Sequence, residues 1–227
     1  MSLEKFFLII GCSFILNSCT TLHPTSSSLT TLKTLDKTVG QAIVVEDLAG
    51  SDVPQTLTLW EKKNGQWKSV FKPMLATAGR KGFAPEGEKR EGDGRTPSGV
   101  YPLGIAFGYA PSVKTKLNYR QVSNEDFWVD DSESPQYNQW VKGSPQAKSF
   151  ERLKRDDDLY KYGIVIEYNT NPIIPGKGSA IFMHVWRGLN YPTAGCVAIS
   201  ERNMIKILSW LDPSQNPVIK LGSLNEH

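Results

Sequence analysis

The stretch Ala180–Ser200, AIFMHVWRGLNYPTAGCVAIS, decides how the rest of the chain is interpreted. It opens with an apolar run that predicts a strand ending near His184, and it continues through a Pro-Thr-Ala-Gly turn to Cys196. His184 is the only histidine away from the two ends of the chain, and Cys196 is the only cysteine outside an N-terminal apolar segment. The eleven residues between them fold back as a loop, which can bring thiol and imidazole together.

These residue types suit nucleophilic catalysis. A thiolate is the reactive form of cysteine, and a neighbouring imidazole both lowers the thiol pKa and protonates a leaving amine. Gly195 lets the backbone approach a bound carbonyl closely, and the amides around Gly195 and Cys196 could form an oxyanion hole. Thr193 either positions the turn or donates a hydrogen bond at the site. The alternative is a buried structural cysteine. No further Cys or His clusters with His184, so we expect neither a metal nor a cofactor.

Composition favours one globular domain with an added tail. The chain has 227 residues, of which 39% are hydrophobic, and a formal net charge of +3. Basic and acidic residues alternate along the chain without a basic stripe, so nucleic-acid binding is not expected. The 19 glycines and 14 prolines favour strands and turns over a helical bundle.

The N-terminus has the pattern of a targeting segment. The apolar run Phe6–Leu16 has signal-peptide length, so residues 1–19 are predicted to be a signal peptide. The residues Leu-Asn-Ser-Cys that end at Cys19 resemble a bacterial lipoprotein cleavage box, which predicts a lipid on Cys19 and membrane attachment in the periplasm or cell envelope. Ordinary signal cleavage, giving a secreted protein, is the alternative. In a lipidated mature chain Cys196 would be the one free thiol.

The remaining chain divides into three predicted parts. Residues 20–40 are rich in Ser and Thr and predict a flexible tether. The catalytic domain is predicted at 41–222, followed by a short tail at 223–227.

The domain is predicted to be mostly β (α+β) with one well-defined helix. That helix is expected at Glu201–Leu211, with Ser200 as N-cap and an apolar face of Met204, Ile205, Leu208 and Leu211. Strands alternate with turn signals, including the hairpin turn Asn64-Gly65. The main expected strands are 41–47, 56–63, 95–109, 162–169, 180–185 and 217–222.

Two segments are predicted to lie outside the regular strands. Residues 80–94 are charged and Gly-rich, as expected of a long loop that is either a substrate-side flap or an ordinary surface loop. Residues 110–158 intersperse aromatic residues with polar ones, which indicates an insertion or lid over the sheet. A short helix is expected within this insertion at 146–154.

At this point the residues resemble a known family. His184 followed by Thr193, Gly195, Cys196 and a hydrophobic residue is similar to the signature of the L,D-transpeptidase catalytic domain (YkuD-type). The segment GDGRTPSGVYPLG at 92–104 resembles the Thr-Pro-x-Gly strand entry of that family. The resemblance covers roughly residues 41–222 and implies a β-sandwich domain.

The sequence departs from the common pattern in three respects. Ala194 stands where that pattern has a second histidine before Gly-Cys, and Ala198 stands where it has a polar residue. The spacing from His184 to Cys196 is also shorter. These changes leave the nucleophile and its base in place, but they put the substrate and the reaction outcome in doubt.

The resemblance implies work on peptidoglycan, in cell wall biogenesis and cell shape. Cys196 would attack the carbonyl between the third and fourth residues of a stem peptide, expel D-alanine and form a thioester, which an amine on a second stem resolves. Arg187 and Arg95 are candidate carboxylate or stem-peptide contacts, or else structural ion pairs. Two alternatives stay open: a cysteine L,D-carboxypeptidase or amidase of the same fold, and a non-catalytic wall-binding lipoprotein.

Overall fold

Eight strands form a ring in the computed structural model, which describes residues 32–48 and 51–222. Strand β1 pairs with both β15 and β2, and this pairing closes the sheet on itself. Around the ring the strands are β1 (Gln41–Leu48), β15 (Val218–Leu221), β7 (Gly99–Gly108), β12 (Tyr162–Ile166), β13 (Phe182–Val185), β14 (Val197–Ile199), β4 (Met74–Thr77) and β2 (Ser51–Lys63). Two further strands, β3 (Gln66–Ser69) and β8 (Tyr119–Gln121), extend the sheet from β2 and β7.

The predicted mostly β fold is confirmed, and the predicted sandwich takes the form of one closed sheet. Strand β2 explains the closure. Its 13 residues pair with β1 along one edge and with β4 and then β3 along the other. The turn between β2 and β3 lies at Asn64-Gly65, as predicted, and both residues have the positive φ values (53° and 75°) that a tight hairpin needs.

Helix α2 (Glu201–Trp210) is the long helix predicted after the cysteine. Ser200 caps it as expected, since its hydroxyl accepts the Asn203 N–H at 3.3 Å. One predicted core residue is wrong, because Ile207 is buried whereas Ile205 is 43% exposed. Ile205 follows Met204 directly and therefore lies about 100° away around the helix.

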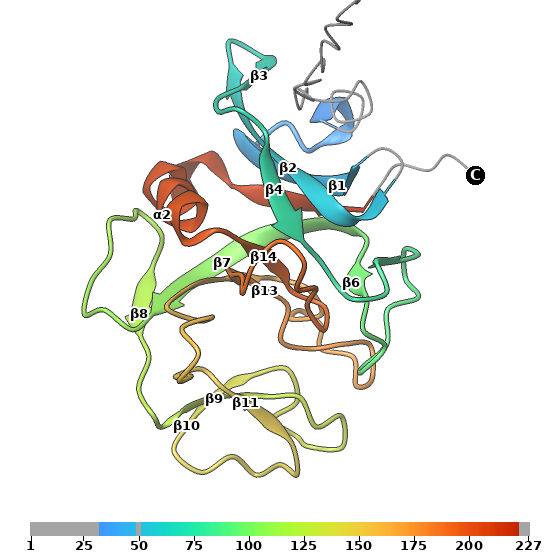
Figure 1. Ribbon diagram of the computed structural model, residues 1–227, viewed down its shortest axis with the longest axis vertical. Coiled ribbons are helices and arrows are strands. Elements are labelled where there is room, and N and C mark those ends of the chain that lie inside the picture. Colours follow the sequence, from blue (N-terminus) through green and yellow to red (C-terminus); the bar gives the residue numbers. More distant parts are fainter. Residues whose placement is uncertain (1–31, 49–50, 223–227) are drawn as a thin grey trace, which may run out of the picture.

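The predicted insertion contains a second, three-stranded sheet in the order β10 (Trp140–Lys142), β9 (Asp126–Val129), β11 (Phe150–Arg152). In Figure 1 this sheet lies at the opposite end of the molecule from β1 and β3. The short helix predicted at 146–154 is wrong, because Phe150–Arg152 pairs with β9 as a strand. The Phe150 ring packs edge-on against Phe127 of β9 at 4.9 Å, and such tertiary packing overrides weak local helix propensity. A lid role for this sheet stays a prediction.

Residues 80–94 are largely irregular, as predicted, and contain only the two-residue strand β5 (Phe83–Ala84), which pairs with β6 (Thr96–Pro97). Within this segment the side chain of Lys89 is almost wholly buried and forms an ion pair with Asp93 at 2.8 Å.

The segment 32–40, assigned to the tether from its composition, packs against the sheet. Leu32 and Val39 are buried in a small cluster with Trp60 and Val218. The packed unit therefore includes residues that precede Gln41. The predicted signal peptide, the lipid on Cys19 and the tail at 223–227 lie outside the described residues. Within the described part of the chain, no helix is long and apolar enough to cross a membrane.

The two faces of β13 and β14 belong to different hydrophobic clusters. Met183, Val185, Val197 and Ile199 lie in the main core, which also contains the apolar face of α2. The opposite faces meet the three-stranded sheet in a second cluster, where Phe182 packs edge-on against Trp128 at 5.0 Å. Cys196 belongs to this second cluster. The boundary between the closed sheet and the inserted sheet therefore positions the predicted site.

Candidate active site

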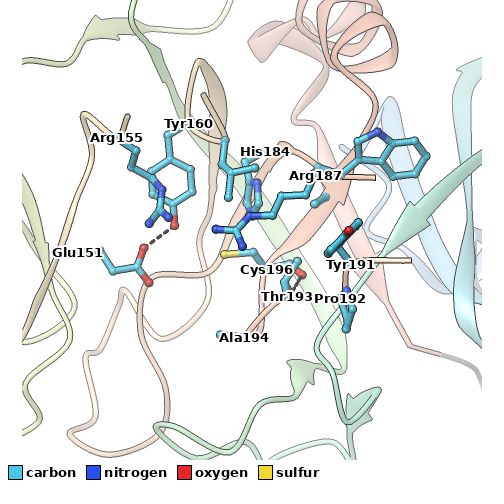
Figure 2. A pocket seen from close by; sticks show the side chains of 13 residues that line it. Glu151, Arg155, Tyr160, His184, Arg187, Tyr191, Pro192, Thr193, Ala194 and Cys196 are labelled. Carbon is cyan, nitrogen blue, oxygen red and sulfur yellow. Dashed lines mark hydrogen bonds between the residues drawn. The ribbon is translucent and has the colours of Figure 1, made fainter. Parts of the chain in front are cut away.

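The structure places His184, on β13, and Cys196, directly before β14, on the same face of the sheet. Strands β13 and β14 are parallel, with His184 beside Ala198. Cys196 precedes Ala198 by two residues, and side chains two apart on an extended chain point to the same face. Both side chains line a pocket of about 300 Å³ (Figure 2). Cys196 and His184, which the sequence predicted to act together, therefore lie in the same pocket.

The His184 ring is oriented by a backbone carbonyl. Its Nδ1 lies 2.7 Å from the Val185 oxygen. A carbonyl only accepts hydrogen bonds, so Nδ1 carries the proton of the neutral ring and Nε2 keeps its lone pair. The ring also packs edge-on against Tyr160, at 5.2 Å between centroids. His184 therefore has the tautomer that a general base acting through Nε2 needs.

The Cys196 thiol is held by the backbone of the neighbouring strand. Its Sγ donates to the Ala180 carbonyl at 3.2 Å and accepts the Phe182 N–H at 3.4 Å. Ala180 has a φ of +52°, which is rare for a residue with a side chain. In the free protein the thiol is thus directed to Ala180, and a reaction would require its proton to pass to the imidazole instead.

The turn before the cysteine is organised by Thr193. The Thr193 hydroxyl accepts the Gly195 N–H at 3.1 Å and donates to the Cys196 carbonyl at 2.6 Å. Thr96, from the Thr-Pro-Ser-Gly segment, also donates to that carbonyl at 3.5 Å, so the two motif segments meet at one atom. The predicted turn role of Thr193 thus has a structural basis, whereas an oxyanion role for the Gly195 N–H would require release of its present bond.

Gly195 has a steric reason to be glycine. A Cβ there would lie 3.0 Å from the Arg95 carbonyl oxygen and 3.2 Å from Ile181 Cδ1. The turn therefore packs closely against the backbone at Arg95.

The two arginines proposed as substrate contacts have different positions. Arg187 lines the pocket, and its guanidinium donates to Asp157 at 3.0 Å. Arg95 is not among the pocket residues; its Nη1 donates to the carbonyls of Lys81 at 2.9 Å and Phe83 at 3.0 Å. Arg95 thus ties the loop before β6 together, and a substrate contact through its side chain is not supported.

Sequence reasoning missed four polar residues around the pocket. Glu151, Arg155 and Tyr160 line it, and Asp157 pairs with both pocket arginines. The Tyr160 hydroxyl donates to Glu151 (Figure 2). Local sequence around these residues carries no motif, and the strand that holds Glu151 has helical character in sequence. Pairing with β9 is what brings it to the pocket.

Burial keeps both candidate catalytic groups neutral. Burial raises the pKa of Cys196 to about 12, and the nearby Glu151 carboxylate raises it further. Burial also lowers the pKa of His184 to about 4, against the opposing effect of the Val185 carbonyl. At pH 7 the free protein therefore holds a thiol and a neutral imidazole.

No metal site accompanies these groups. Among residues 32–48 and 51–222, no three His, Cys, Asp or Glu side chains come together in a way that could hold an ion.

The buried His184 makes a prediction about stability and pH. Its folded pKa of about 4 lies below the ordinary value of 6.5, so below pH 6.5 the unfolded chain takes up the proton first and stability falls. Between pH 6.5 and 5 this group should lower the free energy of unfolding by about 1.6 kcal/mol, because the slope rises from half to nearly the full ~1.4 kcal/mol per pH unit over this interval. Urea unfolding of the wild type and of His184→Gln at both pH values measures it. The variant should lose less stability by that amount, and equal losses would contradict the neutral buried imidazole.

Comparison with solved structures finds two similar chains. One is the helical cell shape determining protein Pgp2 from Campylobacter jejuni, with 16% identity and a TM-score of 0.45 over 83% of this chain and 49% of that one. The other is an L,D-transpeptidase from Stackebrandtia nassauensis, with 15% identity and a TM-score of 0.37 over 82% of this chain and 57% of that one. The chain thus spans about half the length of these proteins. No curated protein sequence matches it.

The family comparison covers most of the domain. The model of the YkuD L,D-transpeptidase catalytic domain matches residues 43–219, a range that runs from β1 to β15 and includes the Cys196–His184 pocket. The chain belongs to the L,D-transpeptidase catalytic domain (YkuD) family.

Proposed function

We propose that this protein is a cysteine L,D-transpeptidase that acts on peptidoglycan stem peptides. The observation that carries the proposal is the placement of Cys196 and His184 on one face of β13 and β14, in one pocket, within a domain of this family. The Nε2 lone pair of His184 supports its role as base, because the Val185 carbonyl already occupies Nδ1.

The reaction runs in two steps. The Cys196 thiol gives its proton to His184 Nε2, and the thiolate attacks the carbonyl between the third and fourth residues of a stem peptide. The imidazolium returns the proton to the departing D-alanine amine, which leaves a thioester on Sγ. The amine of a second stem then attacks the thioester, loses its proton to the imidazole and restores the thiol as the new amide forms.

We also propose that a lipid on the N-terminal part of the chain attaches the protein to a membrane. A lipid on Cys19 would hold the domain in the periplasm or cell envelope, close to its substrate. Incorporation of labelled palmitate into the wild type but not into Cys19→Ala is the expected result, and an unlabelled wild type would favour a secreted protein.

Defined muropeptides test the reaction itself. The full chain without its signal segment is incubated with a tetrapeptide muropeptide, alone and with a second stem as acceptor, and the products are identified by mass spectrometry. A transpeptidase gives cross-linked products, including a donor–acceptor dimer that appears only when the second stem is added. Tripeptide release at the same rate without any acceptor would assign the protein as a hydrolase of this fold. Unchanged muropeptides that still bind the protein would assign it as a wall-binding protein.

A further inference from the structure

Glu151 brings a carboxylate into the candidate active site from the inserted sheet. It lies on β11, lines the same pocket as Cys196 and His184, and accepts a hydrogen bond from the Tyr160 hydroxyl. Figure 2 shows the Glu151 carboxylate directed toward Tyr160, with the Cys196 sulfur nearby. The closed sheet thus provides the candidate nucleophile, while the inserted sheet provides a carboxyl group in the same pocket.

Both arginines of the pocket form their ion pairs with one carboxylate, Asp157, and not with Glu151. Asp157 accepts Arg155 Nε at 2.8 Å and Nη2 at 2.6 Å, and it also accepts Arg187 at 3.0 Å. Asp157 thus engages both guanidiniums that line the pocket. Within the described part of the chain, no Lys or Arg forms an ion pair with Glu151, whose hydrogen-bond partner is a neutral phenol.

A partly buried carboxylate without a cation is energetically unfavourable. Removing a charge from water costs several kcal/mol unless an opposite charge compensates for it. Burial correspondingly raises the pKa of Glu151, against the opposing effects of Tyr160 and Arg155. Arg155 stabilises the charge from a distance without bonding to it, and a ligand that brought a positive group into direct contact would supply an ion pair.

We propose that Glu151 binds a cationic group of the acyl donor, an ammonium on the side chain beside the scissile carbonyl, and that this binding promotes ionisation of Cys196. The proposal rests on the proposed acyl transfer at this pocket. It makes Glu151 a specificity-determining residue, and it assigns a binding role to the sheet inserted at 110–158.

The link to Cys196 follows from charge. After burial, the Glu151 carboxylate is the next largest cause of the raised pKa of the Cys196 thiol. A cation bound to Glu151 would cancel much of that effect, so the correct substrate would itself favour thiolate formation. A substrate without the cation would leave the thiol protonated.

Charged thiol reagents test the site without any substrate. The full-length protein without its signal segment reacts with trimethylammonium-ethyl, methyl and sulfonato-ethyl methanethiosulfonate, and each rate is divided by the rate with free 2-mercaptoethanol. We expect the cationic reagent to modify Cys196 about tenfold faster than the neutral one, since the Glu151 carboxylate in the same pocket attracts it. Glu151→Gln should lose this preference, and it should also react faster with the neutral reagent because the thiol ionises more readily.

Glu133→Gln is the matched control. It removes the same charge from the insertion, but Glu133 is exposed, pairs with Lys148 and does not line the pocket. A cationic preference that Glu151→Gln and Glu133→Gln leave equally intact would overturn the proposal. If circular dichroism shows that Glu151→Gln is unfolded, the wild-type protein alone tests the proposal. Equal wild-type rates for the cationic and neutral reagents, each divided by the rate with 2-mercaptoethanol, would reject the cation site.

Peptide substrates connect the site to the reaction. Two stem tetrapeptides are compared, one with a free side-chain amine on its third residue and one with that amine acetylated. Glu151→Gln should lower kcat/KM about tenfold for the free amine, and for the acetylated peptide it should cause no loss and a modest gain, because the thiol ionises more readily. If neither peptide is turned over, the proposed function is rejected, but the cation site is not, because the reagent rates test that site independently. An equal loss for both peptides would reduce Glu151 to a structural role.

Discussion

Replacing Cys196 with alanine should lower D-alanine release by on the order of 10⁴-fold, because it removes the nucleophile of the proposed acyl transfer. His184→Ala should cause a loss of similar size, since its Nε2 is the proposed base and lies on the same sheet face as the thiol. The two residues act as a unit, so the double variant should lose no more than either single variant. Rates of D-alanine release from a tetrapeptide muropeptide measure all three.

Stability must be separated from catalysis in this experiment. Cys196 is 7% exposed and packs in the second cluster, so truncation also removes apolar contacts. Leu153→Ala serves as the control, because Leu153 lies in the same cluster but does not line the pocket. That variant should be destabilised by about 2–5 kcal/mol and keep its activity at a temperature where it remains folded. Undiminished D-alanine release by Cys196→Ala would refute the nucleophile assignment.

The second large effect concerns Asn138. This residue joins the inserted sheet to Ala180, the residue before β13 whose carbonyl binds the thiol. Asn138 is 3% exposed, and its amide makes four hydrogen bonds. Its Oδ1 accepts Trp128 Nε1 at 2.9 Å and the Ala180 N–H at 3.1 Å, while Nδ2 donates to two carbonyls. Asn138→Ala would leave these buried groups without partners and should destabilise the protein by about 4 kcal/mol.

A matched control exists for the backbone contribution. Asn138 has a φ of 54°, and Asn64 in the exposed β2–β3 turn has a φ of 53°. Asn64→Ala should therefore be destabilised by the same ~1 kcal/mol that alanine costs in the left-handed conformation, without losing buried hydrogen bonds. Chemical unfolding of both variants gives the difference. Equal losses would mean that the amide network of Asn138 contributes nothing measurable.

Asn138 also has a consequence for the site. It fixes the N–H of Ala180, whose carbonyl accepts the Cys196 thiol. Loss of the amide should therefore loosen the thiol as well as the fold.

Local signals predicted the elements that depend on few neighbours. Ser200 indicated the start of α2, and Asn64-Gly65 indicated the hairpin, because a cap and a tight turn are specified within a few residues. The closed sheet could not be anticipated in this way. Its closure requires parallel pairing of Ala42 with Val218, two segments that are far apart in sequence.

The candidate site was likewise predictable only where a local motif marks the residue. Cys196 and His184 stood out because each is a rare residue type in a motif, whereas Glu151 is one of many acidic residues and gains its position through β11 and β9. For Arg95 the structure favours the structural alternative. Its sequence context gave no indication that its Nη1 donates to the Lys81 and Phe83 carbonyls.

Strand β15 has a consequence for the order of folding. It lies between β1 and β7, so the ring has a gap until Val218–Leu221 has been inserted. A nascent chain that lacks these residues leaves the edges of both neighbouring strands unpaired, and such edges are open to other extended chains. The domain therefore completes its native sheet only after nearly all of the chain described here has been synthesised.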